Sequence, residues 1–306
     1  MTSTDVPTEQ QAVPPRTPVS VTRGVLKTMR PRQWVKNVLV LAAPFVGGDL
    51  FTTGIAIHLA IAFAAFSIAA SGIYLVNDAN DVAADRAHPT KRNRPIAAGI
   101  VAPRLAQSVA VVLLLGALAL SFMASVQLVI VLAVYIAVQL AYCYWLKHQP
   151  VLDICIVASG FLLRAIAGGA ATGIALSQWF LLVAGFGSLF MVAGKRYAEM
   201  MLAERTGAKI RKSLERYTAS YLRFVWTLSA TGVIMTYGSW AFQLSQTHHS
   251  RWPVISLVPF VVAILRYAVD VDSGNGGEPE EIALGDRTLQ VLGAALVVTL
   301  IAAVYL

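Results

Sequence analysis

Residues 126–146 read VQLVIVLAVYIAVQLAYCYWL, a stretch without a single charged side chain. A helix needs about 20 apolar residues to cross the hydrocarbon core of a bilayer, and this stretch supplies them. The whole chain follows the same pattern, because 57% of its 306 residues are hydrophobic, 13% are charged and the mean hydropathy is +0.66. A soluble domain carries about 25% charged residues. The composition therefore excludes an ordinary soluble enzyme and predicts an all-α polytopic membrane protein.

Nine apolar segments follow an N-terminal tail, residues 1–22, which is rich in Thr, Pro and Gln and which we expect to be disordered and cytoplasmic. The segments lie at about 34–52, 55–77, 103–123, 126–146, 151–173, 178–195, 219–243, 253–270 and 287–306. We therefore predict nine transmembrane helices in one domain, residues 23–306.

The charged residues predict the topology of these helices. Of the 24 Lys and Arg residues, only Arg251 falls on a segment assigned to the outer face. The positive-inside rule then places the N-terminus in the cytoplasm and the C-terminus outside, in a multi-pass protein of the cell inner (plasma) membrane. Acidic residues beyond the tail follow the same asymmetry, with only Asp49 on the outer side. Charges of both signs on one face predict a cytoplasmic site for a charged, water-borne substrate, and the net charge of +8 needs no nucleic-acid partner.

An acidic motif, NDANDVAAD at residues 77–85, closes the second apolar segment. Asn77, Asp81 and Asp85 are spaced i, i+4 and i+8, and Asp78 comes three residues before Asp81, so a helix brings their oxygens within reach of one ion. Oxygen donors without His or Cys suit Mg²⁺, which takes phosphate oxygens as further ligands. We predict that Asn77, Asp78, Asp81 and Asp85 hold Mg²⁺; the alternative is a solvated acidic helix end.

Basic residues follow this motif at once and suit the charge-assisted hydrogen bonds that a diphosphate accepts, although a basic cytoplasmic loop would also explain them. They are Lys91, Arg92 and Arg94. Further candidate substrate-binding residues lie at or near predicted cytoplasmic helix ends: Lys36, Tyr142, Lys147, Lys195, Arg196, Tyr197 and Glu199. Arg164 lies inside the fifth apolar segment, where a charge is costly, so it either has a functional role or pairs with a carboxylate of a neighbouring helix.

These motifs resemble the UbiA superfamily of intramembrane prenyltransferases, whose first acidic motif, NDxxDxxxD, is matched by residues 77–85. The resemblance covers residues from about 25 to 306 and implies nine transmembrane helices around a central cavity, with Mg²⁺ and a diphosphate at the acids. The superfamily's second motif, DxxxD, is replaced here by KRYAE at residues 195–199. Cations in place of acids suit a donor with an additional phosphate, such as phosphoribosyl diphosphate (PRPP).

This version of the motifs looks like the decaprenyl-phosphate phosphoribosyltransferase branch of the superfamily. The matching stretches are residues 30–37, 142–147, 195–199 and 276–280. The resemblance implies a Mg²⁺-dependent pentosyltransferase that moves 5-phosphoribose from PRPP to polyprenyl (decaprenyl) phosphate in the membrane lipid, releasing diphosphate, for cell-wall arabinan precursors. Asp78, Asp81, Asp85 and Lys195 would then be catalytic, and residues 23–306 would form the catalytic domain. Whether the enzyme is a homo-oligomer is left open.

Two alternatives remain at this stage. A prenyltransferase that joins a prenyl diphosphate to an aromatic or quinone-precursor acceptor keeps the Mg²⁺ motif, but it calls for the second DxxxD motif. A transporter for an anionic metabolite calls for internal repeats and for charges along a pathway through the membrane, whereas these charges gather at one face.

Overall fold

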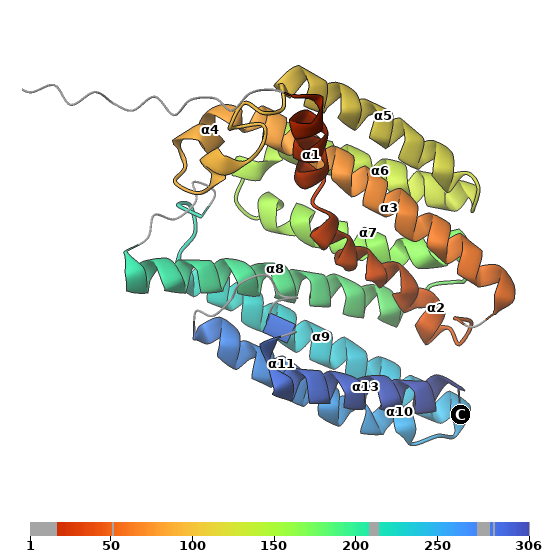
Figure 1. Cartoon of the computed structure of the whole chain (residues 1–306). Coiled ribbons are helices and arrows are strands. Elements are labelled where there is room, and N and C mark those ends of the chain that lie inside the picture. Colours follow the sequence, from red (N-terminus) through yellow and green to blue (C-terminus); the bar gives the residue numbers. More distant parts are fainter. Residues whose placement is uncertain (1–16, 51, 208–213, 274–281, 284, 306) are drawn as a thin grey trace, which may run out of the picture. The chain divides into compact units, whose positions relative to one another are not determined.

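The computed structural model describes residues 17–50, 52–207, 214–273, 282–283 and 285–305 (Figure 1). Within these ranges the long elements are all helices, which confirms the all-α class. The α-helices are α1 (Pro18–Thr28), α2 (Ala42–Val46), α3 (Thr53–Asn80), α4 (Val82–Ala87), α5 (Pro103–Ser121), α6 (Val126–Tyr144), α7 (Leu152–Thr172), α8 (Gln178–Thr206), α9 (Ala219–His248), α10 (Trp252–Ile255), α11 (Leu257–Asp272) and α13 (Arg287–Tyr305). Three 3₁₀ helices, η1 (Pro31–Leu41), η2 (Lys91–Asn93) and η3 (Leu146–His148), lie between them.

Local sequence signals bound several of the long helices. The side chains of Ser125 and Ser177 accept backbone N–H groups at the starts of α6 and α8, and so replace hydrogen bonds that a first turn lacks. The helices α7 and α8 end at Gly173 and Gly207, which have φ angles of 73° and 68°. This left-handed conformation costs glycine little because it has no Cβ atom.

Seven helices of the described chain are long and apolar enough to cross a membrane: Gly54–Asn80, Pro103–Ser121, Val126–Tyr144, Leu152–Thr172, Gln178–Thr206, Trp252–Asp272 and Arg287–Tyr305. The predicted apolar segments at 55–77, 103–123, 126–146, 151–173, 178–195, 253–270 and 287–306 correspond to them. The count of nine is not confirmed, because the segments at 34–52 and 219–243 are not among the seven.

These two segments differ from the others for separate reasons. Residues 34–52 do not form one long helix, since they are divided between η1 and the five-residue α2. The 30 residues of α9 are long enough, but Ser and Thr recur along the helix and lower its hydropathy. Hydroxyls such as Ser229 and Thr231 donate to carbonyls one turn back, at 2.6 and 3.0 Å, so their polarity is satisfied within the helix.

The predicted tail also ends earlier than expected. Residues 18–22 belong to α1, because Thr17 and Ser20 form a reciprocal capping box and Pro18 occupies the first turn, where its missing N–H costs nothing. The first 16 residues of the predicted tail lie outside the described ranges.

The chain forms two compact units. Unit 1 comprises residues 1–34 and 67–116, and unit 2 comprises residues 35–66 and 117–306. Unit 1 holds α1, the end of α3, α4, η2 and most of α5.

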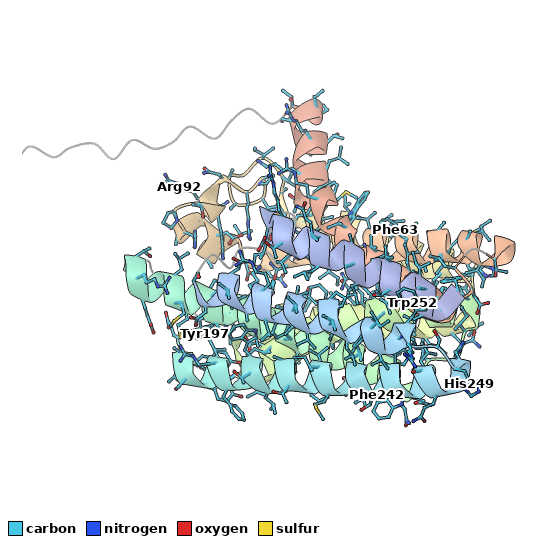
Figure 2. All side chains as sticks on the ribbon, turned by 90° about the horizontal axis from the view of Figure 1, so that it is seen from below. Phe63, Arg92, Tyr197, Phe242, His249 and Trp252 are labelled. Atoms are coloured by element: carbon cyan, nitrogen blue, oxygen red, sulfur yellow. The ribbon has the colours of Figure 1, made fainter. Side chains whose placement is uncertain are left out.

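In unit 2, α8 packs against α7 and, most extensively, against α9, while α11 packs against α13 (Figure 1). An aromatic cluster fills the space between α8, α9 and α11: the ring of Trp226 stacks on those of Phe190 and Tyr197, and Tyr267 packs on Phe190. Figure 2 shows His249 and Trp252 at the turn between α9 and α10, and Tyr197 towards the opposite end of these helices. Tyr197 of the predicted site therefore lies away from the His249 turn.

Candidate active site

The acidic motif occupies the junction of α3 and α4 in unit 1. Asn77 and Asp78 end α3, Asp81 precedes α4 and Asp85 lies within α4. The N–H of Asp81 donates to the carbonyl of Asn77 at 3.0 Å, and that of Asp85 donates to the carbonyl of Asp81 at 2.8 Å, so the helical spacing continues across the junction. The predicted i, i+4, i+8 arrangement is thus present in the backbone.

Two of these carboxylates are buried and paired with arginines. Asp78 and Asp85 are 2% and 3% exposed. Nη1 of Arg94 lies 3.2 Å from Asp78 Oδ1 and 2.8 Å from Asp85 Oδ2. Nη2 of Arg30 lies 2.7 Å from Asp78 Oδ1, and we call these four residues together with Asp81 the acidic cluster. Buried carboxylates need such partners because desolvation of an unpaired charge is costly.

No group of three or more Asp, Glu, His or Cys side chains in the described residues is arranged as a ready metal site. Mg²⁺ does not require one, because it is commonly bound by one or two carboxylates with waters and substrate phosphates as the remaining ligands. The donors at residues 77–85 are all oxygens of Asp and Asn side chains, which is the chemistry that Mg²⁺ prefers. The acidic cluster therefore fits Mg²⁺ bound together with a phosphate.

In the basic loop after the motif, Arg94 belongs to the acidic cluster and the other two predicted residues lie beside it. Arg94 contacts the carboxylates directly, whereas Arg92, labelled in Figure 2, is exposed and Lys91 is half-buried. Nε of Arg86 donates to the carbonyl of Ala97 at 3.0 Å and ties the two ends of this loop together. Arg94 is thus paired with the two buried carboxylates, while Lys91 and Arg92 lie on the adjoining 3₁₀ turn.

In unit 2, the KRYAE segment meets the start of α7 through a buried ion pair. Arg196 and Asp153 are 5% and 1% exposed, and Nη2 of Arg196 lies 3.0 Å from Asp153 Oδ2. The hydroxyl of Tyr217 donates to Asp153 Oδ1 and accepts the N–H of Val151 at 2.6 Å. Burial, and next the hydrogen bond to Asp153, raise the pKa of Tyr217 above its ordinary value. Nη1 of Arg196 is buried and has no hydrogen-bond partner within the described ranges.

Tyr197 points into the interior of unit 2. Its side chain is fully buried, and its hydroxyl donates to Asp272 Oδ1 at 3.1 Å and accepts Nε–H of Arg223 at 3.0 Å. Lys195 and Glu199 lie one helical turn apart on α8 and are half-buried. Lys195 and Glu199 therefore lie on one face of α8, whereas Tyr197 contacts residues of α9 and α11.

Arg164 is held in unit 2 by neutral groups. Nε donates to Asn37 Oδ1 at 2.7 Å, Nη1 to the carbonyl of Gly160 at 2.6 Å and Nη2 to the Tyr135 hydroxyl at 3.0 Å. The guanidinium also lies 4.9 Å from the centre of the Tyr135 ring. The alternative that Arg164 pairs with a carboxylate is not found among the described residues, because aromatic faces and hydrogen-bond acceptors stabilise the cation instead.

The remaining predicted residues of unit 2 divide into two places. Nζ of Lys36 lies 5.8 Å from the centre of the Phe161 ring, and the guanidinium of Arg164 lies 5.9 Å from the same centre, so both cations lie beside one aromatic ring. Tyr142, in the last turn of α6, and Lys147, in η3, are half-buried at the other place. The stretch at 276–280 lies outside the described residues.

Comparison with known proteins shows which family this chain belongs to. A sequence model of the UbiA prenyltransferase family matches residues 38–304. The chain belongs to the UbiA prenyltransferase family. It is 59% identical over 306 residues to the decaprenyl-phosphate phosphoribosyltransferase of Mycolicibacterium smegmatis, covering 96% of this chain and 95% of that relative. It is 60% identical over 291 residues to the protein of the same name from Mycobacterium tuberculosis (strain H37Rv), covering 94% and 96% of the two chains.

Solved structures agree on the fold. A UbiA homolog from Archaeoglobus fulgidus bound to GPP and Mg²⁺ superposes with a TM-score of 0.68 at 15% sequence identity, over 92% of this chain and all of that one. The same homolog bound to Cd²⁺ gives a TM-score of 0.65 at 14% identity, over 92% and 100% of the two chains. That homolog binds divalent metal ions, and this chain is an integral membrane protein of the same fold.

Several residues of the site were not predicted from the sequence. The sequence assigns no separate role to Arg30, which lies in the matching stretch 30–37, or to Asp153, Tyr217 and Arg223. A cation directly before Pro31, at the start of the first apolar segment, was the available signal for Arg30. For Tyr217 and Arg223 the sequence offers no signal, because their partners lie on other helices.

Proposed function

We propose that this protein transfers 5-phosphoribose from PRPP to a polyprenyl phosphate such as decaprenyl phosphate, releasing diphosphate. The observation that carries the proposal is the identity of about 60% over nearly the full chain with relatives that bear this activity in their names.

In this proposal, the carboxylates of Asp78, Asp81 and Asp85, with the amide oxygen of Asn77, hold Mg²⁺ and through it the diphosphate of PRPP. When bound, Mg²⁺ neutralises negative charge on the diphosphate and so makes it a better leaving group. Arg94 is 2.8 Å from Asp85 and is placed to donate to phosphate oxygens next to those carboxylates. Lys91 and Arg92 of the same loop supply further positive charge.

The reaction forms one bond and breaks one. The bond from ribose C1 to the diphosphate oxygen breaks, and a bond from C1 to an oxygen of the polyprenyl phosphate forms. The acceptor is already an anion near neutral pH, so no general base is needed to remove a proton. The protein's task is then to stabilise the leaving diphosphate and to hold the acceptor in line with C1.

Lys195 is the residue of KRYAE that we assign to a substrate phosphate, in place of an acid of the superfamily's DxxxD motif. Glu199, one turn along α8, is assigned to a ribose hydroxyl. Arg196 pairs with Asp153, and Tyr197 is hydrogen-bonded to Asp272 and Arg223, so we assign Arg196 and Tyr197 to positioning α8.

Two further pairs of residues are assigned to the polyprenyl phosphate or to the 5-phosphate. They are Lys36 with Arg164, and Tyr142 with Lys147. We place the site at the cytoplasmic face of the plasma membrane.

The deciding experiment is a transfer assay with the detergent-solubilised enzyme and Mg²⁺. One reaction contains labelled PRPP with polyprenyl phosphate, and a parallel reaction contains a labelled prenyl diphosphate with an aromatic acid. We expect label in the lipid product of the first reaction only. An Asp81→Asn variant should lose turnover by about 10²-fold or more, because a neutral amide binds Mg²⁺ weakly.

Product in the second reaction alone would overturn the proposal in favour of a prenyltransferase. Full activity of Asp81→Asn would remove Asp81 from the metal site while leaving the reaction itself intact.

A further inference from the structure

Arg30 has an unusual backbone. It joins α1 to η1 with φ at 53°, in the left-handed region, although it carries a side chain and directly precedes Pro31. Non-glycine residues adopt this conformation at a cost in free energy, and such residues gather at functional sites where the surrounding structure holds them.

One face of α3 supplies the contacts. Ser71, Tyr74 and Asp78 are spaced i, i+3 and i+7, so their side chains line one face of the helix. Ser71 Oγ accepts the indole N–H of Trp34 at 3.1 Å and lies 3.3 Å from the carbonyl oxygen of Met29. The Ser71 hydroxyl also donates to the carbonyl of Ser67 at 2.8 Å, so Trp34 is hydrogen-bonded to the fully buried Ser71 and Met29 lies beside it, on the two sides of Arg30.

The guanidinium follows the same face of α3. It lies 4.6 Å from the centre of the Tyr74 ring, and its Nη2 reaches Asp78 Oδ1 at 2.7 Å. Nη1 of Arg94 approaches the same oxygen at 3.2 Å. One carboxylate oxygen therefore meets two cations, although the Arg30 side chain remains 31% exposed and that of Asp78 only 3%.

This arrangement affects how a divalent ion reaches Asp78. A metal ion arriving alone meets two positive charges at the carboxylate, and like charges at such distances repel. An ion that arrives with a diphosphate brings acceptors for both guanidinium groups, and arginine binds phosphate oxygens well. The exposed part of Arg30 lets it turn towards such a ligand.

We propose that Arg30 is a diphosphate-binding residue that holds Asp78 in the empty enzyme and makes metal binding depend on the diphosphate. Metal alone then binds weakly, and metal and diphosphate strengthen each other's binding. This inference rests on the proposed function, in which the acidic cluster takes Mg²⁺ and diphosphate.

The test compares Arg30→Gln with the wild-type enzyme in detergent, using two probes. Binding of Mn²⁺ alone is followed by electron paramagnetic resonance, and binding of inorganic diphosphate in the presence of Mg²⁺ by calorimetry. We expect Arg30→Gln to bind Mn²⁺ alone about three- to tenfold more tightly, because one cation beside Asp78 is gone, and to bind diphosphate about tenfold more weakly. A matched control is Arg32→Gln, an exposed arginine two residues away, which should change neither affinity.

A second variant provides an alternative test if the Arg30→Gln protein does not fold. Tyr74→Leu removes the ring under the guanidinium while it retains the charge, and it should change both affinities in the same directions by a smaller factor. A merely structural role for Arg30 predicts that Mn²⁺ binding weakens or stays the same, and either result would overturn the inference.

Failure of the proposed function has a different signature. If the wild-type enzyme bound neither Mn²⁺ nor diphosphate, the assignment of the acidic cluster would fall and this inference with it. If the wild-type enzyme bound both and the Arg30 variants matched it, only the inference would be wrong.

Discussion

Two buried arginines of unit 2 are stabilised in different ways. Arg196 lies against a carboxylate, Asp153, whereas Arg164 donates to an amide, a carbonyl and a phenol and packs on aromatic rings. An uncompensated buried charge costs far more than a neutral polar group. The two sites should therefore respond differently when one partner is changed.

We expect Asp153→Asn to destabilise the protein by about 3–5 kcal/mol, because the substitution preserves the shape of the site but leaves Arg196 without its counter-charge. The measurement is unfolding in detergent, followed by tryptophan fluorescence. Asp49→Asn, at a partly exposed loop position, is the control and should change stability little. Equal stability of the two variants would show that the Arg196–Asp153 pair contributes nothing to folding.

Lys195→Ala tests the departure of KRYAE from the superfamily's acidic motif. We expect the KM for PRPP to rise by about tenfold or more, because a charge-assisted hydrogen bond to a phosphate is lost. Steady-state transfer kinetics measure this, with Lys27→Ala as a control on α1. Unchanged KM and kcat would mean that Lys195 serves only the positive-inside topology.

At the scale of elements, η1 depends on a close approach to α7. A Cβ atom built on Gly168 would collide with the backbone carbonyl of Val40, which is itself fully buried, and would lie 3.2 Å from Pro44. Only a residue without a side chain lets η1 and α2 lie this near to the helix. A long 3₁₀ helix is intrinsically weak, so this packing helps to hold it.

Gly168→Ala should therefore destabilise the protein by about 1–3 kcal/mol, since backbone cannot yield as a flexible side chain does. The control is Gly116→Ala in α5, where an added Cβ has no neighbour within 4 Å and alanine favours the helix. Unfolding of both variants in detergent gives the comparison. A Gly168→Ala protein as stable as Gly116→Ala would contradict the close packing of η1.

At the scale of the whole molecule, the distribution of charge predicts the orientation in the membrane. Single cysteines placed at Arg92 and at His249, in a chain whose exposed Cys155 is replaced by alanine, should react from opposite sides. An impermeant maleimide should label His249→Cys in intact cells and Arg92→Cys only in inverted membranes. Labelling of both from the same side would overturn the topology.

Much of this protein could be predicted locally. Hydropathy located the seven helices of the described chain that are long and apolar enough to cross a membrane, and spacing placed the four residues of the acidic motif on one helical stretch. The segment at 34–52 could not be predicted correctly, because its hydropathy resembles that of a spanning helix while its packing on Gly168 keeps it as η1 and α2. Helix α9 was recognised as a helix, but its hydroxyl groups keep it from the apolar set.

The sequence by itself determined the class of protein, the helical segments and the residue types of the acidic motif, because hydropathy and spacing are local properties of the chain. The tertiary structure decided which charges meet. Arg30 reaches Asp78 across 48 positions, Tyr217 reaches Asp153 across 64, and Arg164 reaches Asn37 across 127. A spacing rule follows one helix at a time, whereas each of these pairs joins segments far apart in the chain. In each pair at least one group, Asp78, Asp153 or Arg164, is buried and shielded from water, so it needs a partner within reach.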